Sequence, residues 1–293
     1  MIAHPLAEAP GRVCLRDVTL RDGLQSEGIL LDVAAKASLA GKIAAAGFRE
    51  LEVASFVHPK RVPAMADAEQ LWKALPPVEG IRYSALVLNR RGLDRAVQAG
   101  VVEIGVFVSA SEAHSRSNSG QGTREALDEA LQVSRGARQA GLRVRAGVMN
   151  AFGCHLEPAP IPLEKVMDLA SALFQEGPEE IVLADTSGIG DPRQIFERVD
   201  ACRRSLAGSR LSLHLHNASG WAFANLLAAL EAGVDVFDVT LGGLGGCPFL
   251  PGAAGNLPAE TVVRFLDAMG IDTGICPAAL EAAARELRAL LGR

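Results

Sequence analysis

The sequence is poor in aromatic residues and carries no excess of positive charge. Aromatic residues make up 4% of the 293 positions, and the formal net charge is −5. Nucleic-acid-binding proteins present a basic face and often rings that stack on bases, so both values exclude nucleic acid as the expected partner. The sequence also lacks an apolar run of about 20 residues, the length that crosses a bilayer, so we expect no membrane partner.

Cysteine is scarce and shows no pattern of pairing. The cysteines are spread along the chain without a C-x-x-C motif, at Cys14, Cys154, Cys202, Cys247 and Cys276. An odd, widely spaced set is typical of the reducing cytosol and predicts a cytoplasmic protein. The first residues, Met1–Gly11, have neither the basic start nor the apolar stretch of a secretory signal, and we expect them to form a flexible tail.

Apolar residues are abundant, at 49% of the sequence, and they alternate between two kinds of segment. Short runs rich in β-branched residues predict strands at Val13–Val18, Glu50–Ala54, Arg82–Val87, Glu103–Val108, Arg143–Val148, Glu180–Ala184, Leu211–His216 and Val234–Thr240. Stretches rich in Ala and Leu predict helices at Val33–Ala46, Pro63–Ala74, Arg90–Ala99, Arg124–Ala140, Leu163–Gln175, Pro192–Ser205, Gly220–Ala232, Ala259–Met269 and Pro277–Leu291.

Eight strands, each followed by a helix, predict a parallel (β/α)8 TIM barrel with an extra C-terminal helix. The chain length agrees, because such barrels take about 250 residues. No stretch rich in Pro, Gly or Ser divides the chain, so we expect residues 1–293 to form a single domain. An open doubly wound sheet is the rival fold, but no Gly-x-Gly-x-x-Gly turn opens the first predicted helix.

Polar side chains follow the ends of most predicted strands. Arg21 and Asp22 come after the first strand, Glu52 lies near the end of the second, and Asp185 follows the sixth. The carboxyl ends of barrel strands meet at one rim, and active sites of this fold lie there. The sequence therefore predicts a functional site at that rim.

Two histidines, His214 and His216, lie on the predicted seventh strand. Side chains at i and i+2 of a strand point to the same face, so both imidazoles can bind one metal ion. The alternative is a pair of core histidines that must be satisfied without a metal. Asp22 offers an anionic oxygen across the barrel, and Asn256 offers an amide oxygen. Two nitrogens, two oxygens and open positions suit Mg²⁺, Mn²⁺ or a catalytic Zn²⁺.

Arg21 and Asp22 are neighbours, and one interpretation is a surface ion pair of little value. Adjacent side chains on an extended segment point apart, so we expect no mutual salt bridge. Arg21 is instead expected to stabilise negative charge on a substrate oxygen. Glu52 lies in an apolar strand and needs a partner if it is buried. We expect it to orient Arg21 or to hydrogen-bond the loop after the first strand.

Cys247 lies in a glycine-rich stretch, Gly242–Asn256, that follows the eighth predicted strand. Most lone cysteines are small buried apolar residues. So many glycines are costly to order unless the backbone must bend or approach a ligand closely. The thiol is therefore expected to act in catalysis, delivering a proton when the loop closes over the site.

Four segments resemble 3-hydroxy-3-methylglutaryl-CoA lyase, namely Thr19–Gln25 (TLRDGLQ), Glu52–Val62 (EVASFVHPKRV), His214–Asn217 and Gly242–Leu257 (GGLGGCPFLPGAAGNL). That enzyme belongs to a superfamily of metal-dependent TIM barrels named for an Asp-Arg-Glu set. The similarity extends over nearly the whole chain. Its most specific element is Gly-Leu-Gly-Gly-Cys-Pro, because related synthases and aldolases share the other motifs but not this cysteine loop.

The resemblance implies a metal site for Mg²⁺ or Mn²⁺ made of Asp22, His214, His216 and Asn256. It also implies that Arg21 stabilises an enolate oxygen and that the thiol of Cys247 belongs to a lid. Coenzyme A would then be part of the substrate.

The resemblance also assigns residues around the metal. Glu52, Asp185 and Arg145 match positions that shape the site, and Gln25 lies against the substrate. The phosphates of coenzyme A would need cations near the rim. Lys60 with Arg61, and the pair Arg90-Arg91, are available, although each is otherwise a solvated charge. Barrels of this kind often pair, so we expect a homodimer or a larger homo-oligomer.

The implied reaction is a retro-Claisen cleavage of 3-hydroxy-3-methylglutaryl-CoA to acetyl-CoA and acetoacetate. Candidates for the base that removes the hydroxyl proton are His214, Asp22 and a metal-bound water. This chain has Thr19-Leu20 where such lyases read Gly-Pro, and Asn217-Ala218-Ser219 where they read Asp-Thr-Tyr. A related thioester, such as citramalyl-CoA or a longer-branched 3-hydroxyglutaryl-CoA, therefore stays open as the substrate.

Other functions are weaker alternatives. A Claisen synthase or aldolase acting on a 2-keto acid shares the motifs, but synthases usually append a regulatory domain. A metal-dependent amidohydrolase carries its His-x-His on the first strand. A catalytically silent scaffold that binds coenzyme A would have no use for the complete set of metal and catalytic residues.

Overall fold

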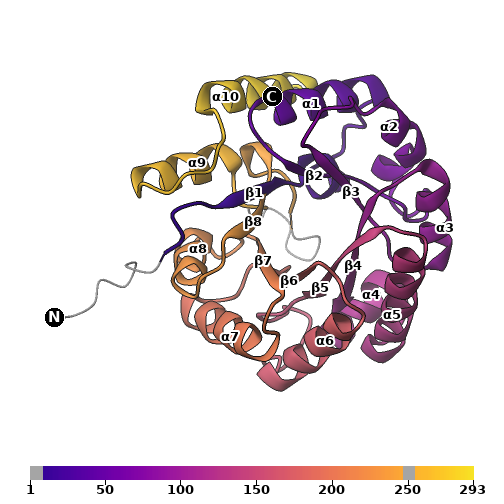
Figure 1. Ribbon diagram of the computed structural model, residues 1–293, viewed down its shortest axis with the longest axis vertical. Helices are drawn as coiled ribbons and strands as arrows, with labels where there is room; N and C mark the ends of the chain where they lie inside the picture. The colour runs from indigo at the N-terminus through magenta and orange to yellow at the C-terminus, as the bar shows by residue number, and fades with distance from the viewer. Residues whose placement is uncertain (1–8, 247–254) are drawn as a thin grey trace.

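The computed structural model describes residues 9–246 and 255–293. Eight parallel strands follow one another around a closed barrel, which is completed where β1 pairs with β8 (Figure 1). The strands are β1 (Cys14–Asp17), β2 (Glu50–Ser55), β3 (Arg82–Leu86), β4 (Glu103–Ser109), β5 (Arg143–Met149), β6 (Glu180–Asp185), β7 (Arg210–Leu215) and β8 (Val236–Val239). The predicted TIM barrel is confirmed, with strand ends within one or two residues of the predicted ranges.

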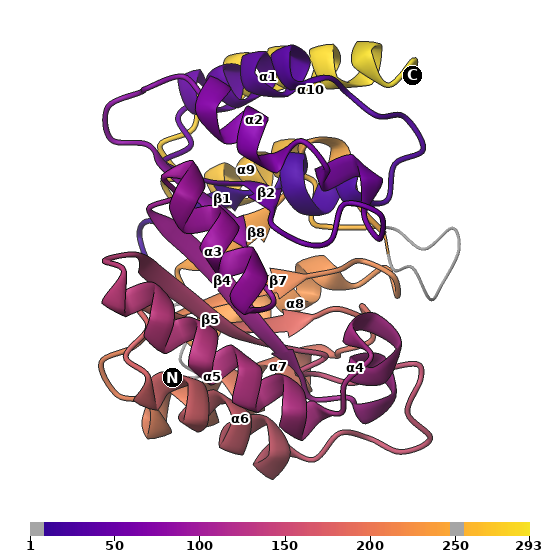
Figure 2. The same ribbon diagram turned by 90° about the vertical axis from the view of Figure 1, so that its right-hand side faces the viewer.

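Helices form a layer around the barrel (Figures 1 and 2). They are α1 (Val33–Ala45), α2 (Ala68–Ala74), α3 (Arg90–Ala99), α4 (Glu112–Ser119), α5 (Thr123–Gln139), α6 (Leu163–Gln175), α7 (Pro192–Ser205), α8 (Ala222–Glu231), α9 (Ala259–Ala268) and α10 (Pro277–Leu290). The last of them, α10, is the predicted extra C-terminal helix, and it packs on α1. Within the two described ranges, no helix is both long and apolar enough to cross a membrane.

Helix α4 was missed by the sequence analysis. Its sequence is polar throughout and has no apolar stripe, which is the signal that predicts a helix packed on a core. A cap supports it instead: the hydroxyl of Ser111 accepts the backbone N–H of His114 at 2.9 Å. Figure 2 shows α4 beyond the end of β4 rather than alongside the barrel.

The helix predicted at Pro63–Ala74 is broken in the structure. A 3-10 turn, η2 (Pro63–Met65), is separated from α2. The buried ammonium of Lys36 donates to the carbonyl of Ala64 and to a carboxylate oxygen of Asp67, both at 2.8 Å. This side chain takes up a carbonyl that a continuous helix would bond internally, so the prediction of one helix was wrong.

The interior of the barrel is charged. Buried ionic side chains extend into it from five strands: Arg16, Glu50, Glu52, Arg145, Glu180 and Asp238, here called the charged interior. Arg16 binds Glu180 through both terminal nitrogens, at 2.9 and 2.7 Å. Barrels of this fold are usually filled by branched apolar side chains. Charges can replace them here because each meets opposite partners, and an unpaired buried charge would be costly.

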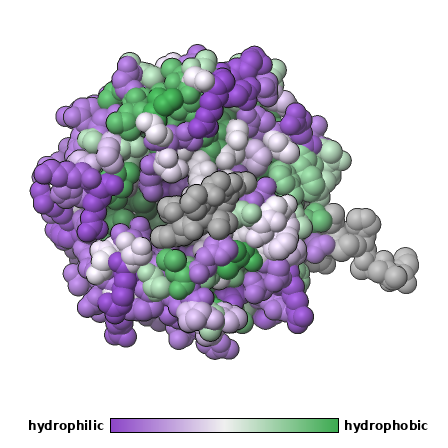
Figure 3. All heavy atoms as spheres, turned by 180° about the vertical axis from the view of Figure 1, so that it is seen from behind, coloured by the Kyte–Doolittle hydropathy of each residue, from purple (hydrophilic) through white to green (hydrophobic). Residues whose placement is uncertain are grey.

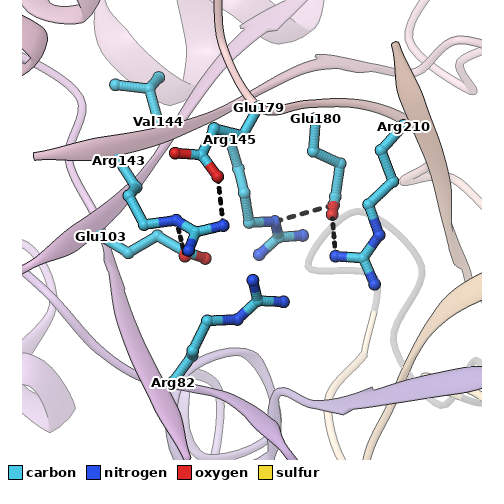
Figure 4. Close-up of a pocket in the computed structure, with 8 residues that line it drawn as sticks. All are labelled: Arg82, Glu103, Arg143, Val144, Arg145, Glu179, Glu180 and Arg210. Carbon is cyan, nitrogen blue, oxygen red and sulfur yellow. Dashed lines mark hydrogen bonds and ion pairs between the residues drawn. The ribbon is translucent and has the colours of Figure 1, made fainter. Parts of the chain in front are cut away.

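The amino-terminal end of the barrel holds a cavity of about 170 Å³ (Figure 4). Its lining residues include Arg82, Glu103, Arg143 and Arg210, which begin strands β3, β4, β5 and β7. Arg210 binds Glu180 at 3.0 Å, and Arg143 binds Glu103 at 3.3 Å. Cations and carboxylates are matched at this end, and residues at this end of a TIM barrel usually serve stability.

Most of the flexible tail predicted at Met1–Gly11 is not among the residues that the structure describes. Residues 1–8 are not among the described positions, whereas the carbonyl of Gly11 accepts a hydrogen bond from Asp272 N at 3.1 Å. The segment that leads into β1 is thus attached to the segment between α9 and α10.

Candidate functional site

The predicted metal ligands come together at the carboxyl end of the barrel. Asp22 lies on a π-helical turn, η1 (Thr19–Gly23), directly after β1. His214 lies on β7 and His216 follows it, while Asn256 comes just before α9. Figure 3 shows this face of the molecule, with a hollow near its centre that both hydrophobic and hydrophilic residues border. Segments far apart in sequence therefore meet at one rim, as predicted.

Asp22, His214 and His216 direct three ligand atoms at one point. The Nε2 atoms of the two histidines are 2.9 Å apart, and Oδ2 of Asp22 lies 3.8 and 3.6 Å from them. The three atoms lie within 4.8 Å of one another. Two imidazole nitrogens and a carboxylate oxygen that converge in this way fit a divalent cation.

Asn256 completes this group. Its Nδ2 donates to Oδ2 of Asp22 at 2.7 Å and to the carbonyl of Leu244 at 3.0 Å. Its Oδ1 is buried and makes no hydrogen bond with the described residues. A buried amide oxygen without a partner is costly, and a bound cation would satisfy it. The four residues predicted as ligands therefore fit a metal ion by chemistry and by placement.

Opposite electrostatic effects act on these side chains. Burial favours a neutral Asp22, but Arg21 and the two histidines outweigh it and hold the pKa of this carboxyl well below its usual range. Burial lowers the pKa of His214, yet the carboxylates of Asp238 and Asp22 raise it overall. Burial and the charge of His214 lower the pKa of His216. Asp22 is thus ionised and His216 stays neutral, as metal binding requires.

Arg21 contacts both of its predicted neighbours. Its Nε donates to Glu52, and NH1 donates to Oδ1 of Asp22 at 2.5 Å. The prediction that Arg21 and Asp22 form no mutual ion pair was wrong, because Thr19–Gly23 is a π-helical turn rather than an extended segment. The prediction that Glu52 orients Arg21 is confirmed. Arg21 is only 8% exposed, so its guanidinium lies in a largely water-free position beside the predicted metal ligand Asp22.

Arg145, on β5, is buried in the charged interior of the barrel. It is 2% exposed, and its guanidinium donates to Glu52 at 2.9 Å, to Glu180 at 3.1 Å and to Asp238 at 3.2 Å. Through Glu52, Arg145 supports the carboxylate that also contacts Arg21. Its role in shaping the site stays a prediction.

Asp185 ends β6 and is fully buried. Burial raises its pKa to about 6, against the hydrogen bonds that its carboxylate accepts from the backbone of Gly190 and Ile189. It thus closes the loop after β6. Gly188 in that loop has no room for a side chain, since a Cβ there would lie 2.7 Å from the Cβ and 2.8 Å from the backbone nitrogen of Ala218. Asp185 therefore holds the loop that lies beside His216, one of the predicted metal ligands.

The other predicted site residues are either exposed at the surface or not among the residues that the structure describes. Gln25 is exposed just after η1, and Lys60 is exposed in the loop after β2. Their contacts with substrate stay predictions. Cys247 is not among the described residues, so its lid role also stays a prediction.

The described part of the glycine-rich stretch lies against two predicted metal ligands, Asp22 and Asn256. Gly245 has a left-handed φ of 99°, and a Cβ there would lie 2.6 Å from Nδ2 of Asn256. The backbone N–H of Leu241 donates to Thr19 Oγ1 at 2.8 Å, which attaches the start of this stretch to the turn that carries Asp22. Glycine is required here because the backbone lies directly over the site.

Two contributors to the site were missed, Asp238 and Arg16. Asp238 Oδ2 lies 3.2 Å from Nδ1 of His214, and Arg16 donates to Asp238 Oδ1 at 3.0 Å. Asp238 is the only charged residue of β8, and Arg16 lies next to Asp17 on β1. Because a buried charge needs a partner, as expected for Glu52, both residues could have been identified from the sequence.

A family model described as HMGL-like matches residues 12–286. The chain belongs to the HMGL-like family. It is 38% identical to a hydroxymethylglutaryl-CoA lyase of Bacillus subtilis over 97% of this chain and 95% of the relative. It is 37% identical to a 3-hydroxy-3-isohexenylglutaryl-CoA/hydroxymethylglutaryl-CoA lyase of Pseudomonas aeruginosa, over 97% and 94% of the two chains.

A solved structure of another HMGL-like protein has the same fold. The crystal structure of a Bacillus subtilis HMG-CoA lyase superposes with a TM-score of 0.93 at 37% identity. The match covers 97% of this chain and 95% of that chain. The resemblance found in the sequence therefore extends to the whole barrel.

Proposed function

We propose that this protein cleaves 3-hydroxy-3-methylglutaryl-CoA to acetyl-CoA and acetoacetate. The observation that carries the proposal is the convergence of Asp22, His214 and His216 beside the buried Arg21. Membership of the HMGL-like family supports the same reaction, because relatives above one-third identity over nearly the full chain carry the lyase name.

The reaction needs charge to be stabilised at two oxygens. The proton of the tertiary hydroxyl is removed, a ketone forms at that carbon, and the adjacent carbon–carbon bond breaks. Its electron pair passes to the thioester as an enolate, which then takes up a proton at carbon. Arg21 supplies a fixed cation for the enolate oxygen, and Glu52 keeps the guanidinium in place. Donors that are oriented before the reaction stabilise such charge most strongly.

Asp22, His214, His216 and Asn256 would hold Mg²⁺ or Mn²⁺. When bound, such an ion would polarise the hydroxyl and keto oxygens and make the hydroxyl more acidic. Gly188 and Gly245 keep space free beside these ligands. Cys247 is proposed as the proton donor to the enolate, on the basis of its place in the sequence between Gly245 and Asn256.

The alkyl branch at carbon 3 of the thioester is the part of the substrate for which the structure gives the least information. Asn217 accepts the backbone N–H of Ala222 at 3.0 Å, and Ser219 donates to the carbonyl of Gly188 at 2.7 Å. Both side chains are thus occupied by the loops around the metal ligands. The Pseudomonas aeruginosa relative named for two thioesters makes a longer branch the alternative to test.

The decisive experiment incubates the purified protein with Mg²⁺ or Mn²⁺ and a small set of thioesters. The set contains 3-hydroxy-3-methylglutaryl-CoA, 3-hydroxy-3-isohexenylglutaryl-CoA and citramalyl-CoA, with acetyl-CoA release followed by chromatography. Pyruvate with acetyl-CoA, assayed in parallel, tests for a Claisen synthase. Turnover of the first compound at the highest kcat/KM supports the proposal, and metal-supplied protein that releases no acetyl-CoA contradicts it.

A cytoplasmic location and a homo-oligomeric state are proposed alongside the reaction. Cys14, Cys154, Cys202 and Cys276 are free thiols, which is consistent with a reducing compartment. Light scattering of the purified protein tests the oligomeric state, and a single-chain mass would contradict it.

A further inference from the structure

Asp238 contacts the metal-site histidine His214 from the side opposite the other ligands. Oδ2 of Asp238 lies 3.2 Å from Nδ1 of His214, and the two residues are directly paired between β7 and β8. Asp238 is only 2% exposed. An ionised carboxylate can only accept hydrogen bonds, so Nδ1 of His214 carries the ring proton. When the ring is neutral, its lone pair is then on Nε2, the atom that faces Asp22 and His216.

Two arginines fix the orientation of this carboxylate. Arg16 NH1 donates to Oδ1 of Asp238 at 3.0 Å, and Arg145 NH2 donates to Oδ2 at 3.2 Å. Both guanidinium groups are almost completely buried, at 1% and 2% exposure. Asp238 therefore cannot rotate without breaking ion pairs inside the barrel.

His216 has no equivalent partner. Its Nδ1 is buried and makes no hydrogen bond to any residue within 9–246 and 255–293. The described residues thus fix the tautomer of His214 through its Nδ1, but provide no partner for Nδ1 of His216. This asymmetry indicates that Asp238 has a role specific to His214.

We propose that Asp238 is a positioning residue that keeps His214 in the tautomer able to bind a cation. The inference rests on the metal site of the proposed function, but it concerns the ring proton of His214 and can be tested separately. Hydrogen bonds from carboxylates to the outer nitrogen of a ligand histidine commonly set ring orientation and metal affinity.

The variant Asp238→Asn has nearly the same shape and reverses the hydrogen bond. The amide oxygen is expected to take the place of Oδ1, which lies 3.0 Å from Arg16 NH1 and 3.4 Å from Arg145 NH2, because both guanidinium groups can only donate. The amide NH₂ then turns toward His214. Nδ1 must then accept, and the ring proton moves to Nε2, where it blocks the cation. A carboxylate-to-amide change beside a catalytic histidine of serine proteases acts through such a wrong tautomer.

The first measurement is the ¹⁵N spectrum of the histidine rings in metal-free protein. In the unmodified protein we expect His214 to be protonated on Nδ1, and in Asp238→Asn on Nε2. The variant His214→Gln identifies the signals. If Asp238→Asn does not fold, the unmodified protein still decides, because a neutral His214 protonated on Nε2 overturns the inference.

The second measurement is Mn²⁺ affinity by calorimetry. We expect Asp238→Asn to weaken binding by roughly 10- to 100-fold, the usual effect of losing such a partner. The matched control is Glu180→Gln, which also removes a carboxylate from Arg16 and Arg145 but does not contact His214. The control is expected to retain the affinity and the tautomer of the unmodified protein.

Each outcome has a distinct meaning. Equal Mn²⁺ affinity and an unchanged tautomer in Asp238→Asn overturn the inference and leave the proposed lyase function intact. Equal losses in both variants also overturn it, since the charged interior as a whole would then be responsible. If unmodified protein binds no Mn²⁺, the metal-dependent function fails, and the ring spectra still decide the role of Asp238.

Discussion

Gly245 lies directly against Asp22. A Cβ on Gly245 would be 3.3 Å from Oδ2 of Asp22 and 2.6 Å from Nδ2 of Asn256. Asp22, a predicted metal ligand, is thus covered by backbone. Since real Cβ atoms essentially never approach another heavy atom to 2.6 Å, a side chain at position 245 must displace the amide of Asn256.

The variant Gly245→Ala should therefore lose activity out of proportion to stability. Its methyl group would push Asn256 away from Asp22, and we expect kcat to fall at least about 10-fold with weaker Mn²⁺ binding. The matched control is Gly242→Ala, which also has a left-handed backbone (φ 63°), but no atom of the described residues lies within 4 Å of the added Cβ. Both should lose about 1 kcal/mol of stability from backbone strain, so equal kinetic effects would contradict the steric argument.

Removal of the metal should abolish turnover reversibly. Dialysis against a chelator is expected to stop acetyl-CoA release, and Mg²⁺ or Mn²⁺ should restore it. The variant Asp22→Asn keeps the shape of the ligand but removes the only anionic donor of the Asp22–His214–His216 group. We expect its metal affinity to drop by at least about 10-fold. Calorimetry measures the affinity, and full activity of chelated protein would refute the metal requirement.

Glu52 should matter to the rate more than to metal binding. Its carboxylate accepts from Arg21 and from Arg145, and it contacts none of the predicted ligands directly. Glu52→Gln removes the charge that holds Arg21 toward the substrate, so kcat is expected to fall by about 10²- to 10³-fold. The Mn²⁺ affinity should stay within a few-fold of normal, and an affinity loss as large as that of Asp22→Asn would argue against the assigned role.

Asp17 should make the folded state less stable as the pH rises. Burial raises its pKa from 3.8 to about 7, despite the hydrogen bonds from Thr19. Between these values the folded protein binds more protons than the unfolded chain, so unfolding becomes easier with increasing pH. The contribution of this group changes by at most about 1.4 kcal/mol per pH unit and is fully present only below pH 4 or so.

The variant Asp17→Asn isolates that effect, because its side chain is neutral at every pH. Urea unfolding of both proteins between pH 4.5 and 7.5 should show a smaller decline in the variant. Parallel curves for the two proteins would mean that Asp17 does not titrate in this range.

Much of the fold could be predicted because the signals are local. Each strand–helix unit shows its own periodicity, and the strands of this barrel pair with their neighbours in sequence. Helix α4 was missed for the same reason, since a polar segment above the rim has no apolar stripe. The break in the helix predicted at Pro63–Ala74 was also missed, because it depends on the side chain of Lys36, which is 28 residues away from the carbonyl of Ala64 that it binds.

The sequence by itself determined the barrel, the rim on which the polar groups lie, and the histidine pair, because strand periodicity and the order of strands decide which residues share a face and an end. Only the tertiary structure decided which charged side chains contact one another. Arg145 turned out to hold Glu52, Arg21 turned out to contact Asp22, and Asp238 was found behind His214. Such pairings depend on which side chains can reach one another across the closed interior of the barrel, because every buried charge there needs an opposite partner. The partner can be distant in sequence: Arg16 and Asp238 are more than 200 residues apart.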